Sequence, residues 1–294
     1  MTGLSVYQLA LAALVLLAAA YVLIGSVFLI PGKKDVARDL FQAILSMTIV
    51  AGTLMAVVVI GDWALVPFFL LLAARTGFEA AAIRFDTKQA LIAAGISAIC
   101  TASVLIWPML TYGVLGVWCL LFARIVAVPG AKDTSIWRWS ELFVYPILPM
   151  ALLAWAGLDD TLRPLMLVAY ILIETFDSYA YVAGKLVGRT KAFPVLSPRK
   201  TVEGLLGGAV ILMLTAAIVA AFADMPIVTA MTLALITGAL GVIGDLAASR
   251  LKRAAGVKDF PIVLPKQGGL LDIADSWIAG GGGLAALFLV WTMV

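Results

Sequence analysis

The sequence contains no histidine, only two cysteines and few charged residues. The absence of histidine excludes catalysis by Ser-His or Cys-His pairs and zinc sites with histidine ligands. Cys100 and Cys119 lie in separate apolar segments without CxxC spacing, so both are expected to be packing residues. No GxxxxGK[ST] motif occurs, so a Walker A loop is excluded. Charged residues make up 13% of the chain, about half the ~25% typical of a soluble domain.

Hydrophobic residues make up 64% of the chain and gather in long runs. Several runs reach the ~20 residues that cross a bilayer as a helix, and none alternates as strands of a membrane barrel do. We therefore expect an all-α, polytopic integral membrane bundle of about nine or ten transmembrane helices. The expected spans are 6–30, 40–60, 89–107, 109–128, 141–158, 165–183, 205–223, 227–248 and 273–294, and the short run 63–74 either crosses or lies half-buried.

The chain is expected to form one membrane domain, 1–294, with a helical scaffold in 1–160 and the catalytic helices and loops in 161–294. If ten spans cross, all but one of the 20 Lys and Arg residues fall on one side, the exception being Arg163. The positive-inside rule makes that side cytoplasmic and both termini external. The first run has no preceding Lys or Arg and no evident cleavage site, so we expect a retained span. The expected location is a bacterial cytoplasmic membrane, with the active site facing the cytoplasm.

A first polar cluster occupies residues 174–208. Glu174 and Asp177 are three residues apart in an apolar helix and share a face. Acids within a span are costly and mark functional sites, although a structural pairing with a buried cation is the alternative. Lys185 and Arg189 follow, one helical turn apart. Further on, Ser-Pro-Arg-Lys-Thr at 197–201 supplies hydroxyls and cations at the start of the next apolar helix, an arrangement that suits phosphate. The alternative is a basic loop that only sets topology or contacts lipid headgroups.

A second cluster, 244–275, repeats this chemistry. Asp245 lies near the end of an apolar run, and Lys252 and Arg253 follow on the same helix. Asp272 and Asp275 share a face of the last helix. These three aspartates are predicted to converge on one or two Mg²⁺ ions, because hard cations prefer carboxylate, water and phosphate oxygens. The alternative is pairing of each carboxylate with a neighbouring Lys or Arg.

The order of residues in 177–208, D-S-Y-A-Y-x-x-G-K-x-x-G-R, then S-P-R-K-T-x-E-G, resembles the phosphatidate cytidylyltransferases, also called CDP-diacylglycerol synthases. The second cluster agrees with that family's signature, including Gly268-Gly269-x-x-Asp272-x-x-Asp275. The resemblance implies a membrane enzyme that uses CTP, Mg²⁺ and phosphatidic acid to make CDP-diacylglycerol and pyrophosphate. It also implies that Asp245 and Asp272 are metal-site residues and that 197–201 belongs to the active region.

Two positions depart from the family pattern. Gln267 stands where the family usually has histidine, and Ile273 where it usually has arginine. These departures favour a related lipid phosphate as substrate or weak activity. They also suggest the first alternative, a divergent, weakly active paralogue. Two further alternatives are a CTP-dependent lipid or polyprenol kinase-like enzyme and a membrane transporter that uses the buried acids as ion sites.

The resulting assignments are as follows. The candidate catalytic residues are Asp177, Lys200, Asp245 and Asp272. The candidate phosphate- and nucleotide-binding residues are Lys185, Arg189, Ser197, Lys200, Thr201, Lys252 and Arg253, and the candidate metal ligands are Asp245, Asp272 and Asp275. The expected partners are CTP, phosphatidic acid or a related lipid phosphate and membrane lipids, without nucleic acid. A homodimer is left open.

Overall fold

The computed structural model describes residues 34–127, 134–222, 225–263 and 268–293, together with separate positions between 11 and 29. Within these residues, eight helical segments are long and apolar enough to cross a membrane. They are Asp62–Ala82 (α3), Thr87–Ile106 (α4), Leu110–Ala127 (α5), Ser135–Leu158 (α6, η1 and α7), Arg163–Val187 (α8), Val202–Phe222 (α9), Ile227–Ala254 (α10) and Leu270–Met293 (α11). The polytopic helical bundle is confirmed, whereas the expected first span, 6–30, lies largely outside the described residues.

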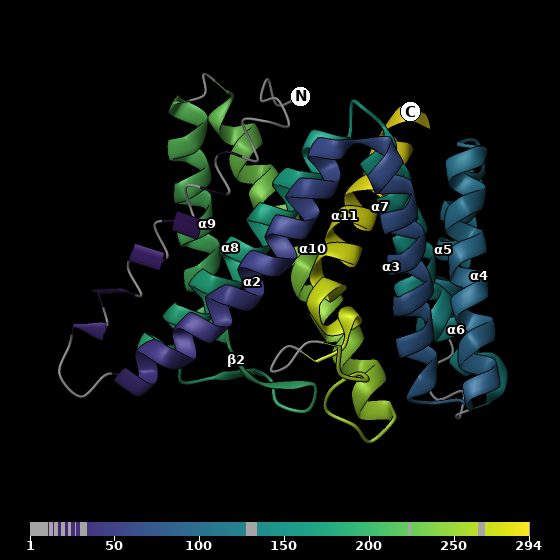
Figure 1. Ribbon diagram of the computed structural model, residues 1–294, viewed down its shortest axis with the longest axis horizontal. Coiled ribbons are helices and arrows are strands. Elements are labelled where there is room, and N and C mark those ends of the chain that lie inside the picture. Colours follow the sequence, from purple (N-terminus) through teal and green to yellow (C-terminus); the bar gives the residue numbers. More distant parts are fainter. Residues whose placement is uncertain are drawn as a thin grey trace.

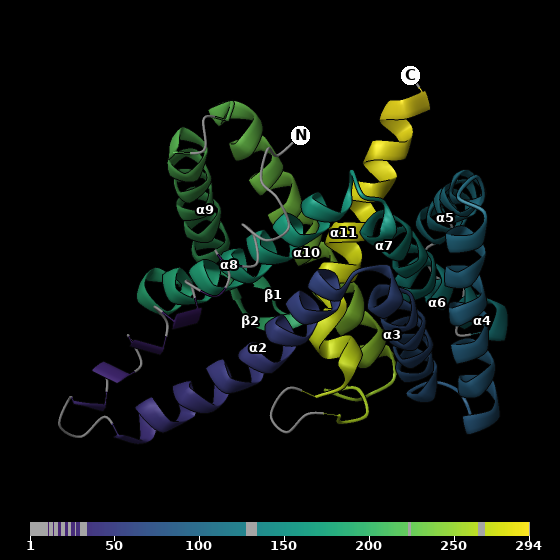
Figure 2. The ribbon, with the colours of Figure 1, turned by 45° about the horizontal axis from the view of Figure 1, so that its top comes forward.

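Helix α2, Lys34–Ile60, precedes these segments and contains a shorter apolar stretch, Thr48–Ile60. It runs obliquely to α3 in both views, and it packs mainly against that helix (Figures 1 and 2). The second expected run, 40–60, is thus helical, and its helix begins earlier than hydropathy alone indicated.

The short run 63–74 is part of a longer helix, because α3 continues through two charged residues to Ala82. Arg75 Nε donates to Glu79 Oε1 at 2.6 Å, one helical turn away, and Glu79 is fully buried. The ion pair offsets the cost of two charges in an apolar helix. The run 63–74, which hydropathy predicted to be a short helix, is thus part of a helix long enough to cross a membrane.

The expected span 141–158 is divided. Helix α6, Ser135–Leu142, passes through a π-helical turn, Phe143–Ile147 (η1), into α7, Leu148–Leu158. The backbone leaves helical geometry at Tyr145, directly before Pro146, which lacks an N–H and cannot continue the hydrogen-bond ladder.

The interior of the bundle lies around α7 and α11, whose residues are mostly buried. Four consecutive glycines, 280–283, lie on α11, and a Cβ added at Gly282 would overlap the backbone of Pro149. These helices approach more closely than side chains would permit.

A two-stranded antiparallel hairpin, Lys191–Phe193 (β1) and Ser197–Thr201 (β2), connects α8 to α9. It lies at the end of the bundle where α10 ends and α11 begins (Figure 1). The sequence predicted a loop that leads into a helix in this region, whereas the structure contains a pair of strands. Both polar clusters thus lie at the same end of the molecule.

Candidate functional site

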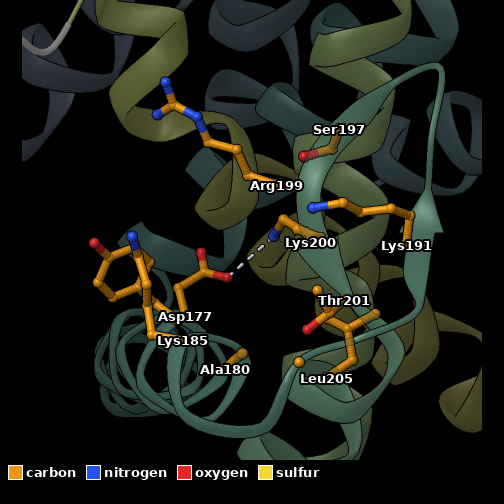
Figure 3. Close-up of a pocket in the computed structure, with 12 residues that line it drawn as sticks. Asp177, Ala180, Lys185, Lys191, Ser197, Arg199, Lys200, Thr201 and Leu205 are labelled. Atoms are coloured by element: carbon orange, nitrogen blue, oxygen red, sulfur yellow. Dashed lines mark hydrogen bonds and ion pairs between the residues drawn. The ribbon is translucent and has the colours of Figure 1, made fainter.

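Lys200 joins the two polar clusters. Its Nζ lies 3.3 Å from Asp177 Oδ1 on α8 and 3.0 Å from Asp245 Oδ2 on α10. The lysine itself belongs to β2, so three elements meet at one ammonium group. Figure 3 shows its side chain reaching from the hairpin toward Asp177.

The neighbouring carboxylates stabilise the protonated form of Lys200. Burial lowers the pKa of the ammonium, but the carboxylates of Asp177 and Asp245 outweigh burial, so the pKa is raised above its usual value. Lys200 is therefore protonated at neutral pH. A lysine in this state can attract an anion, but it cannot act as a general base.

Beside this triad, a pocket of about 550 Å³ opens between α8, the hairpin and the start of α9. Its size is typical of a small-molecule site, which usually occupies ~300–1,000 Å³. Four cationic side chains line it, from Lys185, Lys191, Arg199 and Lys200, against the single acid Asp177. Figure 3 shows Lys191 and Lys200 extending from the hairpin, with Lys185 beside Asp177 on α8. The excess of positive charge suits a polyanion such as a triphosphate.

Several predicted phosphate-binding residues line this pocket: Lys185, Ser197, Lys200 and Thr201. Lys185 also lies over the ring of Tyr181, with its Nζ 5.6 Å from the ring centre. Arg189 is not among the lining residues, and its backbone N–H donates to Glu203 Oε2 at 3.0 Å. Lys191 and Arg199 are cations of the pocket that the assignment by sequence left out.

Thr201 and two glycines bring the hairpin close to the helices. The Thr201 hydroxyl accepts a hydrogen bond from the Gly204 N–H at 3.1 Å, which caps the start of α9. A Cβ at Gly204 would lie 2.8 Å from both Ala180 O and Thr201 Oγ1, and one at Gly188 would lie 2.6 Å from Thr201 Oγ1. Only glycine permits this approach, which sets one wall of the pocket.

Lys252 and Arg253 do not reach this pocket. Lys252 Nζ donates instead to Asp272 Oδ1 at 2.6 Å, joining α10 to α11. The second oxygen of Asp272 accepts from the Phe260 and Gly269 N–H groups, each at 2.9 Å. Arg253 donates to the Val257 carbonyl at 2.9 Å. Asp272 therefore organises the start of α11 and the segment before it, in addition to any role in binding a metal.

Among the described residues, the expected convergence of Asp245, Asp272 and Asp275 is not seen as a cluster of three carboxylates. Helices α10 and α11 touch beside Asp245, because a Cβ at Gly244 would lie 2.7 Å from Asp275 O. Asp275 is buried and accepts hydrogen bonds from the N–H and hydroxyl of Ser276. In the described part of the chain, no three acidic or cysteine side chains are close enough to enclose a metal ion.

The donor chemistry nevertheless fits Mg²⁺. The ion usually takes one or two carboxylates and completes its shell with waters and substrate phosphates. Asp245 shares the Lys200 ammonium with Asp177, and its neighbour Gly244 packs against the backbone of Asp275. Asp245 therefore supplies such an oxygen next to the cationic pocket.

A model of the cytidylyltransferase family matches residues 41–291, which is most of the chain. The chain belongs to the cytidylyltransferase family. Its curated relatives include the phosphatidate cytidylyltransferases of Staphylococcus saprophyticus, 38% identical over 115 residues, and of Bacillus subtilis, 42% identical over 112 residues. These alignments cover 38% and 37% of this chain and 44% and 42% of the two relatives, so the chain spans less than half of the relatives' length.

A further polar contact, which the sequence did not predict, joins α3 to the start of α11. Glu79 on α3 accepts from the Leu270 and Leu271 N–H groups at 3.0 and 2.7 Å, at the start of α11. The negative carboxylate satisfies two helix N–H groups that have no partner within the helix. A residue of the expected scaffold thereby fixes the helix that carries Asp272. The only signal in the sequence was an acid in an apolar helix.

A second buried acid, Glu141 on α6, binds two arginines. Arg84 and Arg250 both form ion pairs with its carboxylate, the latter at 2.8 Å. Arg138 donates to the Arg84 carbonyl at 2.9 Å. These contacts connect the expected scaffold to α10, because Arg250 lies on that helix within one turn of Lys252.

Ile273 lies in the first turn of α11, next to Asp272, and is partly buried. Gln267, the other departure from the family pattern, lies outside the described residues.

Proposed function

We propose that this chain is a CTP-dependent cytidylyltransferase that converts phosphatidic acid, or a related lipid phosphate, to CDP-diacylglycerol and pyrophosphate. The observation that carries the proposal is the position of Lys200. It lies in a cationic pocket and contacts two carboxylates on different helices, Asp177 and Asp245. The names of the relatives, phosphatidate cytidylyltransferases, support the substrate class.

In the proposed reaction, an oxygen of the lipid phosphate attacks the α-phosphorus of CTP. A new P–O bond forms there, the bond to the β-phosphate oxygen breaks, and pyrophosphate leaves with the electron pair. A lipid phosphomonoester is already ionised at neutral pH, so no strong general base is required. A chain without histidine can support this chemistry through positioning and charge neutralisation alone.

The protein's contribution is electrostatic. Lys185, Lys191, Arg199 and Lys200 surround the triphosphate, and the hydroxyls of Ser197 and Thr201 donate to its oxygens. Thr201 already accepts from Gly204, which leaves its hydroxyl proton for a phosphate oxygen. Asp177 and Asp245 hold Lys200 in place through its two ion pairs.

One or two Mg²⁺ ions would supply charge neutralisation for the triphosphate and the leaving pyrophosphate. Asp245 is the primary candidate ligand, with Asp177 and Asp275 beside it. Asp245 holds an ion pair with Lys200 through one oxygen, whereas both oxygens of Asp272 are engaged, one by Lys252 and the other by the Phe260 and Gly269 N–H groups. This makes Asp272 the weaker candidate.

The proposed setting is the cytoplasmic membrane of a bacterium, with the hairpin end of the bundle in the cytoplasm and both termini outside. The bacterial organisms of the relatives support the bacterial part of this proposal, and the orientation rests on the charge asymmetry of the sequence. The homodimer stays a prediction.

The test is a reaction of purified protein with vesicles that contain phosphatidate and diacylglycerol, Mg²⁺ and CTP labelled at either the α- or the γ-phosphorus. A cytidylyltransferase places the α-label in the lipid and releases the γ-label as pyrophosphate. A lipid kinase does the opposite, and a transporter or an inactive paralogue labels no lipid. The Asp245→Asn variant is the control for contaminating activity.

A further inference from the structure

We propose that an apolar groove between α8, α9 and α10 holds one acyl chain of the lipid phosphate during the reaction. The inference rests on the proposed function, and it adds a subsite for the lipid's tail to the pocket for its phosphate. The groove has a volume of about 270 Å³ and is lined by apolar side chains from all three helices.

The groove begins where the cationic pocket ends. Leu205, in the first turn of α9, lines both the pocket and the groove. On α8, Asp177 lines the pocket and its neighbour Phe176 lines the groove. On α10, Ile243 lines the groove two residues before Asp245, the partner of Lys200. On each of the three helices, the residues that line the cationic pocket or contact Lys200 therefore lie close in sequence to residues that line the apolar groove.

This arrangement fits a molecule with an anionic head and an apolar tail. The base and ribose of a nucleotide are polar, so a nucleotide would not bind favourably in the apolar groove. A lipid phosphate whose head lies near Lys200 would place its chains at the level of Leu205. The charge of the pocket and its continuity with the groove therefore specify the occupant.

The direction and length of the groove agree with this occupant. Leu205, Ala209 and Leu212 recur at intervals of four and three residues on one face of α9. Seven residues of helix span ~10 Å. This is roughly two thirds of one leaflet, because the whole hydrocarbon core is ~30 Å thick.

The floor of the groove is fixed, whereas its rim is open. Phe176 and Leu212 are almost completely buried, and a Cβ at Gly238 would lie 3.2 Å from the Phe176 ring. Leu235 and Ile243 at the rim are 45% and 58% exposed. A chain can therefore enter sideways from the bilayer and rest on a preformed surface.

Two alanines allow the groove to be filled without touching the cationic pocket. Ala209 on α9 and Ala239 on α10 face it from opposite walls. Ala239→Leu and, separately, Ala209→Leu are expected to raise the KM for long-chain phosphatidate on the order of tenfold. The kcat and the KM for CTP stay within about twofold of the wild type. Ala221→Leu, an exposed change near the far end of α9, is the matched control and leaves all three constants unchanged.

The kinetics are measured in phosphatidylcholine vesicles that contain either dioleoyl or dihexanoyl phosphatidate. The short-chain lipid reaches less of the groove, so its KM should change least. An active Ala239→Leu protein with wild-type KM for both lipids would overturn the proposal. Ala239 is exposed, so this variant is expected to fold even if Ala209→Leu does not.

Labelling separates a specific subsite from ordinary bilayer contact. A phosphatidate with a diazirine in one acyl chain is photolysed with the wild-type protein in phosphatidylcholine vesicles. Saturable labelling of α9 and α10 peptides, competed by unlabelled phosphatidate and reduced in Ala239→Leu, supports the subsite. Labelling that ignores the competitor means that only bulk lipid fills the groove. This measurement decides the question even if the wild-type protein makes no CDP-lipid, an outcome that would defeat the proposed function alone.

Discussion

The ammonium of Lys252 lies 2.6 Å from the carboxylate of Asp272, and neither side chain exposes more than a tenth of its surface. The pair links the last turns of α10 to the first turn of α11. Its cation also lies 5.2 Å from the centre of the Phe260 ring. Two residues expected to bind a nucleotide and a metal are thus engaged with each other.

We expect Lys252→Met to destabilise the protein by ~3–5 kcal/mol, because Asp272 would be left buried without a counter-ion. Lys258→Met, in the exposed segment that follows, is the control and should have little effect. The measurement is thermal unfolding in detergent. The double variant Lys252→Met with Asp272→Asn should recover part of the loss, and a double variant no more stable than Lys252→Met would contradict the pairing argument.

Asp245→Asn should lower turnover by at least ~10²-fold with little change in thermal stability, because the variant loses a candidate ligand for Mg²⁺ beside the cationic pocket. The assay is transfer of α-labelled CTP to lipid at increasing Mg²⁺. Asp272→Asn should also lose transfer while the protein still inserts, but with lower stability. Wild-type turnover in either variant would remove that residue from the site.

Lys200→Met should reduce kcat/KM for CTP by ~10–100-fold, the usual worth of a hydrogen bond to a charged group. The variant also leaves Asp177, which lines the pocket, and Asp245 beside it without their shared cation. Lys200→Arg should retain part of the activity. If Lys200→Met bound CTP as well as the wild type, the phosphate role of this lysine would be wrong.

The pH dependence of Lys200 follows from its raised pKa. Its ion pairs contribute their full stability below the unfolded pKa of about 10.5, and this contribution is lost as pH rises through the higher folded pKa. The difference in Tm between the wild type and Lys200→Met should therefore be constant from about pH 7 to 9 and shrink only above about pH 10.5. A difference that vanished near neutral pH would mean that the lysine is not held charged.

Glu79→Ala should destabilise the protein by about 1–3 kcal/mol and lower activity, because two N–H groups at the start of α11 would lose their acceptor. Glu79→Gln retains an acceptor oxygen and should fall between the wild type and Glu79→Ala. Arg75→Met removes the ion-pair partner of Glu79. Because the Arg75 side chain is more exposed, this variant should lose less stability than Glu79→Ala. Hydrogen exchange at Leu270 and Leu271 reports on the cap directly. Unchanged exchange in Glu79→Ala would show that the cap is not needed.

Gly204→Val should raise the KM for CTP, because its side chain would push against Thr201 and Ala180 and displace the hairpin. Gly116→Ala on α5 is the control, since a Cβ there meets nothing within 4 Å. Helical alanine is favoured over glycine by ~1 kcal/mol, so the control should be neutral or more stable. Equal CTP kinetics in the two variants would argue against a fixed hairpin wall.

The sequence by itself determined the helical membrane class, the approximate spans from α4 onward and the two polar clusters. Hydropathy is a local property, and long apolar runs in a bilayer can satisfy their backbone only as helices. The motif also placed Asp177, Lys200 and Asp245 in one site, and Lys200 does contact both acids.

Only the tertiary structure decided which charge meets which. It paired Lys252 with Asp272, formed a hairpin from 191–201 and brought Glu79 to a helix that begins 191 residues later in the chain. The groove below the cationic pocket likewise needs three helices side by side. Such partners are chosen by packing between distant segments, because a buried charge is stable only where another element supplies its counterpart. No local pattern in the sequence records that choice.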